Sequence, residues 1–414
     1  MTTDAELDQR LVLVASKIRV LGALSFPEQT LERFLSQWHQ GKPELPAQPP
    51  LAPPDAAVLE ELRAIERQAD QGHPLGRFLH LTAESYRKAV EMLSCTGTPT
   101  FHRLSREIYG GPDQRLPGTH LTQLEAADRL LAATAALTEA TLEHDSDYCL
   151  TAEHVADELR RRVDAFFIDD KIDIVIDPRL SAKAAASATR VRIRGATAFS
   201  EMDIDQLAEH ELFVHSASAL NGRRQKAATA LSLGAPRTTA TQEGLATFAE
   251  LITGAIDLAR LRRIALRIRA VHLAEQGADF IDVFRYFMGA GQTELESVHS
   301  AMRIFRGGDV RGHHPFTKDV VYLRGLIGVH TFLHKAIAEV RPELVSRLFV
   351  GRLTTGDALA LDELCDRGEI LPPKYVPHWA QNIRALAAYL SFSGLLNDID
   401  LDIVAIDELL RPPT

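Results

Sequence analysis

Apolar residues recur along most of the chain at the three- and four-residue spacing of helices that bury one face. Residues 4–25 show this pattern, and residues 55–165 show it almost throughout. Two short stretches differ, because residues 172–177 and 190–195 alternate apolar and charged side chains as half-buried strands do. The pattern therefore predicts an α+β protein that is mostly helical and contains one small sheet.

Prolines and changes of periodicity divide the chain into four segments. Six prolines lie between Pro43 and Pro54, and such a run favours an extended connector over a helix. The predicted segments are the N-terminal helices with this connector (1–56), a helical region (57–165), the core that holds the strands (166–340) and a C-terminal helical region (341–414).

The composition is that of a globular protein with an acidic balance. Of the 414 residues 45% are hydrophobic, and the formal net charge is −10. An acidic protein lacks the basic surface that releases counterions from nucleic acid, so we expect no nucleic-acid partner. The arginines within 260–269 are interpreted as a solvated helix face.

Cysteine usage and hydropathy indicate a cytoplasmic protein. Cys95, Cys149 and Cys365 are scattered and odd in number, which gives neither a disulfide framework nor a metal-ligand spacing. The first residues lack the charged-then-apolar pattern of a secretory signal, and no apolar run is long enough to cross a membrane. We therefore expect no membrane partner, while the oligomeric state is left open.

The most informative stretch is residues 210–215, His-Glu-Leu-Phe-Val-His. In the metallopeptidase motif H-E-x-x-H the histidines lie four residues apart on one helical face, bind Zn²⁺ together and hold the glutamate beside the reacting water. Here the spacing is five, and residues five apart diverge by roughly 140° on a regular α-helix. A local π-helical widening, which is frequent at functional sites, would bring both rings to one ion. The alternative is a pair of ordinary histidines on a helix.

A catalytic metal site of this type needs a third protein ligand. Glu243 is the best candidate, because it follows the chain break at Pro236 and begins a second helix with apolar spacing from Leu245 to Ile252. A helix with two histidines followed by a helix with a glutamate is the layout of the gluzincin peptidases. Glu250, on the same face, is either a fallback ligand or a solvated or salt-bridged residue.

Several short motifs together resemble a known family. They are residues 210–215, Asn221, Gln225, the Thr-Gln-Glu-Gly-Leu-Ala of 241–246, Phe305-Arg306-Gly307, Phe316-Thr317-Lys318-Asp319 and Tyr322-Leu323. This set resembles the bacterial QEGLA-motif proteins, which have been labelled flavohaemoglobin expression-modulating and are related to the eukaryotic microtubule-associated tyrosine carboxypeptidases. The resemblance implies a zincin-like, gluzincin-type metallopeptidase core with helical additions. Phe213 and Val214 depart from the usual hexapeptide but spare the liganding positions, so they bear on substrate choice.

The predicted chemistry is metal-assisted hydrolysis of an amide. His210, His215 and Glu243 would hold one Zn²⁺ ion, and Glu211 would act as the general base. A tetrahedral intermediate also needs a donor for its oxyanion, and Tyr322 is the candidate.

Cleavage at a C-terminus needs, in addition, a fixed cation for the terminal carboxylate. The resemblance implies that Lys318, Arg303 and Arg306 line the substrate site, although each can equally be a surface charge. Arg192, on the second predicted strand, is a further candidate, because a zincin-like layout has a strand that borders the cleft and pairs with extended substrate. The resemblance thus implies a carboxypeptidase whose partner is a peptide or protein C-terminus.

Two other functions use the same residues. A non-catalytic regulatory or binding protein could keep the metal as a structural staple, and an amidohydrolase could act on a non-peptide amide. Glu211 separates the first from a peptidase, because a structural site has no need of a carboxylate beside the metal.

Overall fold

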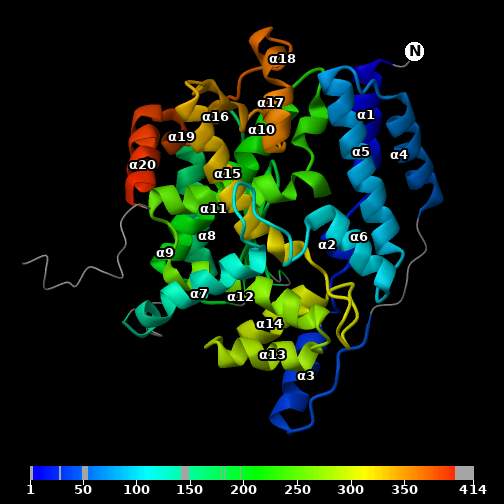
Figure 1. Ribbon diagram of the computed structural model, residues 1–414, viewed down its shortest axis with the longest axis vertical. Coiled ribbons are helices and arrows are strands. Elements are labelled where there is room, and N and C mark those ends of the chain that lie inside the picture. Colours follow the sequence, from blue (N-terminus) through cyan, green and yellow to red (C-terminus); the bar gives the residue numbers. More distant parts are fainter. Residues whose placement is uncertain are drawn as a thin grey trace, which may run out of the picture.

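The computed structural model describes residues 3–27, 29–48, 55–140, 149–178, 180, 182–195 and 197–396. Within these ranges most residues are helical (Figure 1), and a single sheet has three strands, so the predicted α+β class is confirmed. The zincin-like architecture and the four segment boundaries remain predictions. The end of the proline-rich connector (49–54) and the last part of the C-terminal region (397–414) lie outside the described residues.

The N-terminal part of the chain is helical. Its helices are α1 (Asp4–Ala15), α2 (Val20–Ala23), α3 (Gln29–His39), α4 (Ala56–Gln68), α5 (Pro74–Leu93), α6 (Pro99–Tyr109), α7 (Gln123–Ala140) and α8 (Ala152–Phe166). Helices α1, α4 and α5 pack together through fully buried residues such as Leu11, Leu62 and Leu79. Thr98 caps α6 and Pro99 occupies its first turn, where a missing N–H costs nothing.

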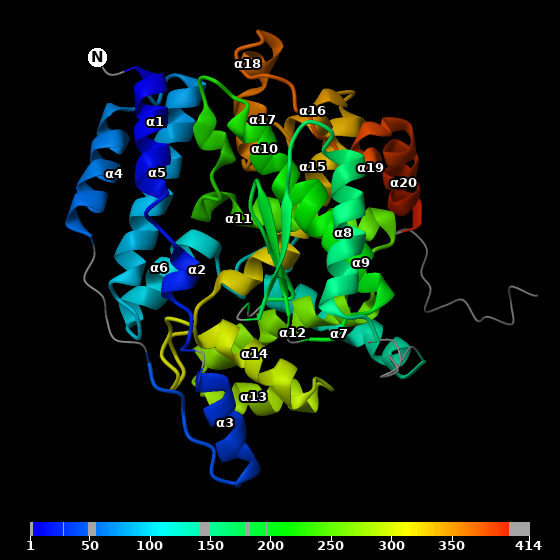
Figure 2. The same cartoon turned by 180° about the vertical axis from the view of Figure 1, so that it is seen from behind.

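The sheet lies near the middle of the molecule, beside α8 (Figure 2). Its order is β1 (Asp173–Asp177), β3 (Arg190–Arg194), β2 (Ala184–Ala186), with β1 parallel and β2 antiparallel to β3. Val191 and Ile193 are fully buried, whereas Arg192 between them is exposed. The alternation predicted β1 and β3. It did not predict β2, which forms the edge of the sheet on the side of β3 away from β1.

One continuous helical segment follows the sheet: α9 (Glu201–Leu207), the π-helix η2 (Ala208–Ser216) and α10 (Ala217–Arg223). The elements after it are η3 (Thr229–Ser232), η4 (Pro236–Thr238), α11 (Thr239–Thr253), α12 (Leu258–Glu275), α13 (Phe280–Gly289), α14 (Glu294–Phe305), η5 (Lys318–Val320) and α15 (Val321–Ala338). The C-terminal helices are α16 (Glu343–Arg347), α17 (Thr355–Ala360), α18 (Asp362–Asp366), α19 (His378–Gln381) and α20 (Ile383–Leu396).

Helices α11 and α15 make the closest helix contact near the site. A Cβ built on Gly244 would lie 2.1 Å from the backbone carbon of Gly325, and one on Gly325 would lie 2.0 Å from the Ala240 oxygen. Two side chains of any size would separate the backbones, so the glycine pair permits this crossing. It fixes α11 against the start of α15, and both carry residues of the site.

Three hydrophobic clusters meet at η2 and the first turns of α15. Leu212 belongs to the cluster around the sheet, Val214 to the cluster of α11 and α15, and Tyr322 to the cluster of α12, α13 and α14. A site built here is held by packing on several sides, which gives it the rigidity that catalysis requires. Among the helices described, none is both long and apolar enough to span a membrane.

Candidate metal centre and active site

The nine residues Ala208–Ser216 form a π-helix rather than an α-helix. Its wider turn suits the five-residue spacing of the histidines, because a π-helix bonds residue i to residue i+5. The His210 and His215 rings lie on the same side, with centroids 4.8 Å apart and planes at 88°. The local widening expected from the sequence is therefore present, and it extends over the whole motif.

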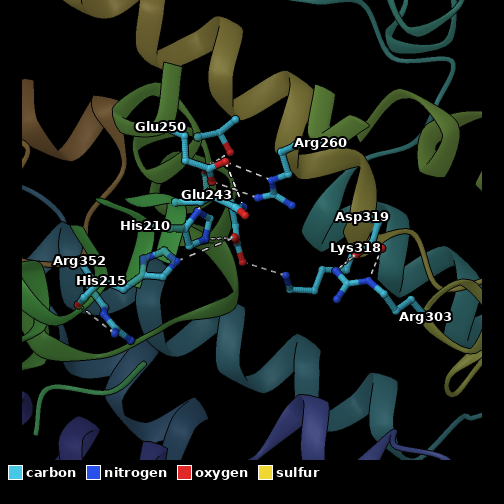
Figure 3. Close-up of polar contacts among 11 residues, drawn as sticks. His210, His215, Glu243, Glu250, Arg260, Arg303, Lys318, Asp319 and Arg352 are labelled. Atoms are coloured by element: carbon cyan, nitrogen blue, oxygen red, sulfur yellow. Dashed lines mark hydrogen bonds and ion pairs between the residues drawn. The ribbon is translucent and has the colours of Figure 1, made fainter. Parts of the chain in front are cut away.

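Glu243 on α11 completes a cluster with the two histidines (Figure 3). Its Oε2 lies 3.5 Å from His210 Nε2 and 3.9 Å from His215 Nε2. The three ligand atoms fall within 4.8 Å of one another, and no other trio of His, Cys, Asp or Glu in the described residues does so. Two imidazole nitrogens and one carboxylate oxygen are a donor set that suits zinc and leaves a position open, so these residues fit a divalent metal. The side chains of His215 and Glu243 are 15% exposed, which lets solvent reach the cluster.

Glu250 contacts the other nitrogen of His210. Its Oε1 lies 2.6 Å from His210 Nδ1, and Arg260 binds both of its oxygens over 3.1 Å. Burial opposes ionisation of Glu250, but Arg260 and His210 outweigh burial and lower its pKa to about 2. An ionised Glu250 fixes the orientation of the imidazole and leaves Nε2 free for a metal. Of the two interpretations that the sequence allowed for Glu250, the structure therefore supports a salt-bridged residue over a fallback ligand. Glu250 lies two helical turns beyond Glu243 on α11.

Glu211 lies on η2 directly after His210 and is 8% exposed. Burial lowers the pKa of His210, but hydrogen bonds to Glu243 and Glu250 outweigh burial and raise this pKa well above its usual range. The charge of Glu211 adds to the rise. Glu211 is therefore a second, nearly buried carboxylate beside the cluster and is not one of its three ligands.

Lys318 and Tyr322 lie on the α15 side of the cluster. The Lys318 Nζ lies 3.1 Å from Glu243 Oε1 and 5.4 Å from the centre of the Tyr322 ring. Arg260 lies 5.7 Å from the same ring, so Tyr322 is held between two cations. Tyr322 also interacts with Arg303. Lys318 is therefore the nearer of the two to the cluster, and Tyr322 supports it through its ring.

The predicted substrate arginines have different surroundings. Arg303 makes a bidentate ion pair with Asp319, with both distances 2.8 Å. Arg306, 9% exposed, lies over the Phe316 ring, and its guanidinium has no hydrogen-bond partner within the described chain. Arg192 is paired with Asp177 on the exposed side of the sheet, and the structure does not bring it into the cluster.

The interpretation of 260–269 as a solvated helix face is wrong for part of that face. The side chains of Arg260 and Arg267 are only 13% and 11% exposed, and they reach Glu250 and Asp319 respectively. Seven residues separate them, which is two helical turns, so both lie on the inner face of α12. That spacing was the signal in the sequence. Arg352 and Tyr86, beside the cluster, had no comparable signal, because each lies far from the motifs along the chain.

A π-helix and its neighbouring helix thus present two imidazoles and a carboxylate to one point, with a further carboxylate and a lysine at its margin. This arrangement defines a candidate metal-dependent hydrolase centre. The chain belongs to the microtubule-associated tyrosine carboxypeptidase family, whose model matches residues 32–398. A comparison with curated proteins gave no match. Family membership confirms the resemblance read from the motifs and indicates a carboxypeptidase-like peptidase.

Proposed function

We propose that this protein is a zinc-dependent carboxypeptidase that removes a residue from the C-terminus of a peptide or protein. The observation that carries the proposal is the convergence of His210, His215 and Glu243, with Glu211 next to them and outside the ligand set. Family membership supports the direction of cleavage, because the family is named for a carboxypeptidase.

When bound, a divalent ion such as Zn²⁺ supplies Lewis acidity that makes water nucleophilic near neutral pH and polarises a carbonyl. Glu211 takes the proton of the attacking water and donates it to the leaving nitrogen, which departs as an amine. Its near burial strengthens both transfers, because few waters compete for the proton. Glu250 and Arg260 hold the His210 ring in one orientation throughout.

Lys318 and Tyr322 stabilise the oxyanion on the other side of the cluster. The Lys318 ammonium is held by Glu243 and by the Tyr322 ring, so its charge is fixed before substrate binds. Arg303 interacts with Tyr322 and is itself neutralised by Asp319. These contacts favour a supporting role for Arg303 and a direct role for Lys318.

The ligand count favours catalysis over a structural metal. Structural zinc sites are closed by four protein ligands, whereas catalytic sites keep a position for water. The described residues supply three ligands, and Glu211 stands beside them. The same residues would serve an amidohydrolase acting on a non-peptide amide, and the choice of substrates below separates the two.

The test is hydrolysis of blocked peptides that end in each of the twenty amino acids, followed by mass spectrometry. Wild type is compared with Glu211→Gln and with Glu201→Gln, an exposed glutamate at the start of α9 that serves as the matched control. We expect loss of single C-terminal residues in wild type and in the control, and a rate about 10²–10⁴-fold lower in Glu211→Gln. Equal rates in all three proteins, or cleavage only of small non-peptide amides, would overturn the proposal.

A further inference from the structure

Arg352 is a partly buried arginine beside the cluster that the chemistry above does not use. Its backbone N–H donates to the Leu231 carbonyl over 2.6 Å, and its Nη2 donates to the His215 carbonyl oxygen over 3.2 Å. Figure 3 shows Arg352 on the His215 side of the cluster, with Lys318 on the opposite side of Glu243. A second cation is therefore fixed next to a metal ligand, across the site from the first.

The charge of Arg352 is not neutralised by an ion pair. Among the described residues no carboxylate lies within 4.0 Å of its guanidinium, the His215 carbonyl is its one side-chain hydrogen-bond partner, and its buried Nε has none. Tyr86, which is 5% exposed, interacts with this charge, and its hydroxyl makes no hydrogen bond in the described chain. The guanidinium of Arg352 has one hydrogen-bond partner and the Tyr86 hydroxyl has none, so both groups can still donate to an anion.

Gly234 lies close to one end of this guanidinium. A Cβ built on Gly234 would lie 2.7 Å from Arg352 Nη1. A side chain at this position would push against Nη1 and compete with any ligand there. The absence of a side chain at Gly234 therefore lets Arg352 keep its position.

The geometry of proton transfer connects this position with the substrate, on the premise of the proposed function. Glu211 donates its proton to the leaving nitrogen, so that nitrogen lies within roughly 3 Å of its carboxylate. In a C-terminal residue the carboxylate oxygens are only about 3.5 Å from the same nitrogen. The terminal carboxylate must therefore bind on the Glu211 side of the cluster. The charge of Arg352 interacts with Glu211 and with Glu243, and that of Lys318 interacts most strongly with Glu243, Tyr322 and Asp319.

We propose that Arg352, together with the Tyr86 hydroxyl, binds the α-carboxylate of the C-terminal residue and thereby restricts the enzyme to chain ends. A planar guanidinium that has no ion-pair partner among the described residues suits the charge and the two oxygens of a carboxylate. Arg306, a second arginine near the site, makes no hydrogen bond to another described residue; it lies beside Arg303 and Phe316 and is the alternative anchor. The two assignments are separable, because they place the carboxylate on opposite sides of the cluster.

The experiment compares each blocked peptide as a free acid and as its C-terminal amide. The variants are Arg352→Gln, Tyr86→Phe and Arg306→Gln. Arg223→Gln is the control, because Arg223 is an exposed arginine whose charge interacts with that of Arg352. Hydrolysis gives kcat/KM for both members of each pair. Binding of the same pairs to Glu211→Gln protein, measured by calorimetry with and without chelator, gives a readout that does not depend on turnover.

Wild type should prefer the free acid in both assays. In Arg352→Gln we expect the free acid to lose about 10–100-fold in kcat/KM and in affinity while the amide is unchanged, because only the acid makes the charged hydrogen bonds. Tyr86→Phe should lose about 3–10-fold on the acid, and Arg223→Gln nothing. A merely structural role for Arg352 would slow acid and amide alike. If Arg352→Gln does not fold, Gly234→Ala carries the test, since it crowds Nη1 without changing any charge and should lower the preference for the acid.

If both Arg352→Gln and Gly234→Ala still prefer the free acid over the amide, the assignment to Arg352 is overturned. If only Arg306→Gln loses this preference, the terminal carboxylate binds at Arg306 instead. In either case the proposed function stands, because wild type still cleaves. Failure of metal-loaded wild type to cleave or bind any peptide overturns the proposed function, and the assignment with it.

Discussion

The close crossing of α11 and α15 predicts that one methyl group added at Gly244 will weaken both zinc binding and stability. In Gly244→Ala the new Cβ would lie 2.1 Å from the Gly325 backbone carbon and 2.2 Å from its oxygen. These atoms belong to the backbone of a packed helix and have no rotamer that moves them aside. The two helices must separate by about 1 Å to restore even the closest normal contact.

This separation acts on Glu243, the proposed metal ligand beside Gly244 in the chain. Glu243 precedes the substituted residue, and Lys318, which binds it, leads into α15. A functional site tolerates displacements of only about 0.5 Å, so we expect zinc affinity to fall at least about 10-fold. Overpacking should also lower the free energy of unfolding by about 1–3 kcal/mol.

The matched control is Gly328→Ala on α15, three residues beyond Gly325, where an added Cβ meets no atom within 4 Å. It should raise the free energy of unfolding by about 0.5–1 kcal/mol, because alanine is the better helix former, and leave zinc binding unchanged. Urea unfolding of metal-free protein and competition with a chromophoric chelator measure the two quantities. Equal stability and equal zinc affinity in Gly244→Ala and Gly328→Ala would refute the reasoning.

Two further predictions concern groups outside the ligand set. Glu250→Gln removes the negative charge of the acceptor that orients His210, so chelator competition should show zinc affinity about 10–100-fold weaker, whereas unchanged affinity would show that this charge is not needed to hold the ring. Burial and Arg194 lower the pKa of His299 to about 4. The unfolded chain takes up this proton near pH 6.5, so stability that is complete above pH 6.5 is lost as the pH falls towards 4. After allowance for partial exposure the loss between pH 7 and pH 5 is about 1 kcal/mol, and His299→Gln should show correspondingly less pH dependence in urea titrations; an identical slope in both proteins would exclude this cause.

The ligand cluster could be predicted because its information is local in the sequence. A five-residue histidine spacing and a helix start near Glu243 each specify a short segment, and the π-helix and α11 have the form that these patterns indicated. The edge strand Ala184–Ala186 could not be predicted, because three alanines neither alternate nor favour strands, and pairing with β3 is what makes them one.

The surroundings of the cluster depend on long-range packing that no local pattern contains. The seven-residue spacing of Arg260 and Arg267 places both on one face of α12, but only the contacts of α12 with α7 and η5 decide which face is buried. Arg352 reaches the His215 carbonyl from a turn 137 residues further along the chain. Such contacts form only when distant parts of the chain fold together, so the sequence did not indicate Arg352 as a residue of the site.

The most direct test of the account is the metal content of the purified protein, measured by elemental analysis without exposure to chelator. Wild type and Glu211→Gln should each carry about one zinc per chain, while His215→Ala and Glu243→Ala should carry almost none, since two ligands do not retain the ion. Wild type that is free of metal and does not bind added zinc would contradict the central claim, and so would zinc that stays bound after both ligand substitutions.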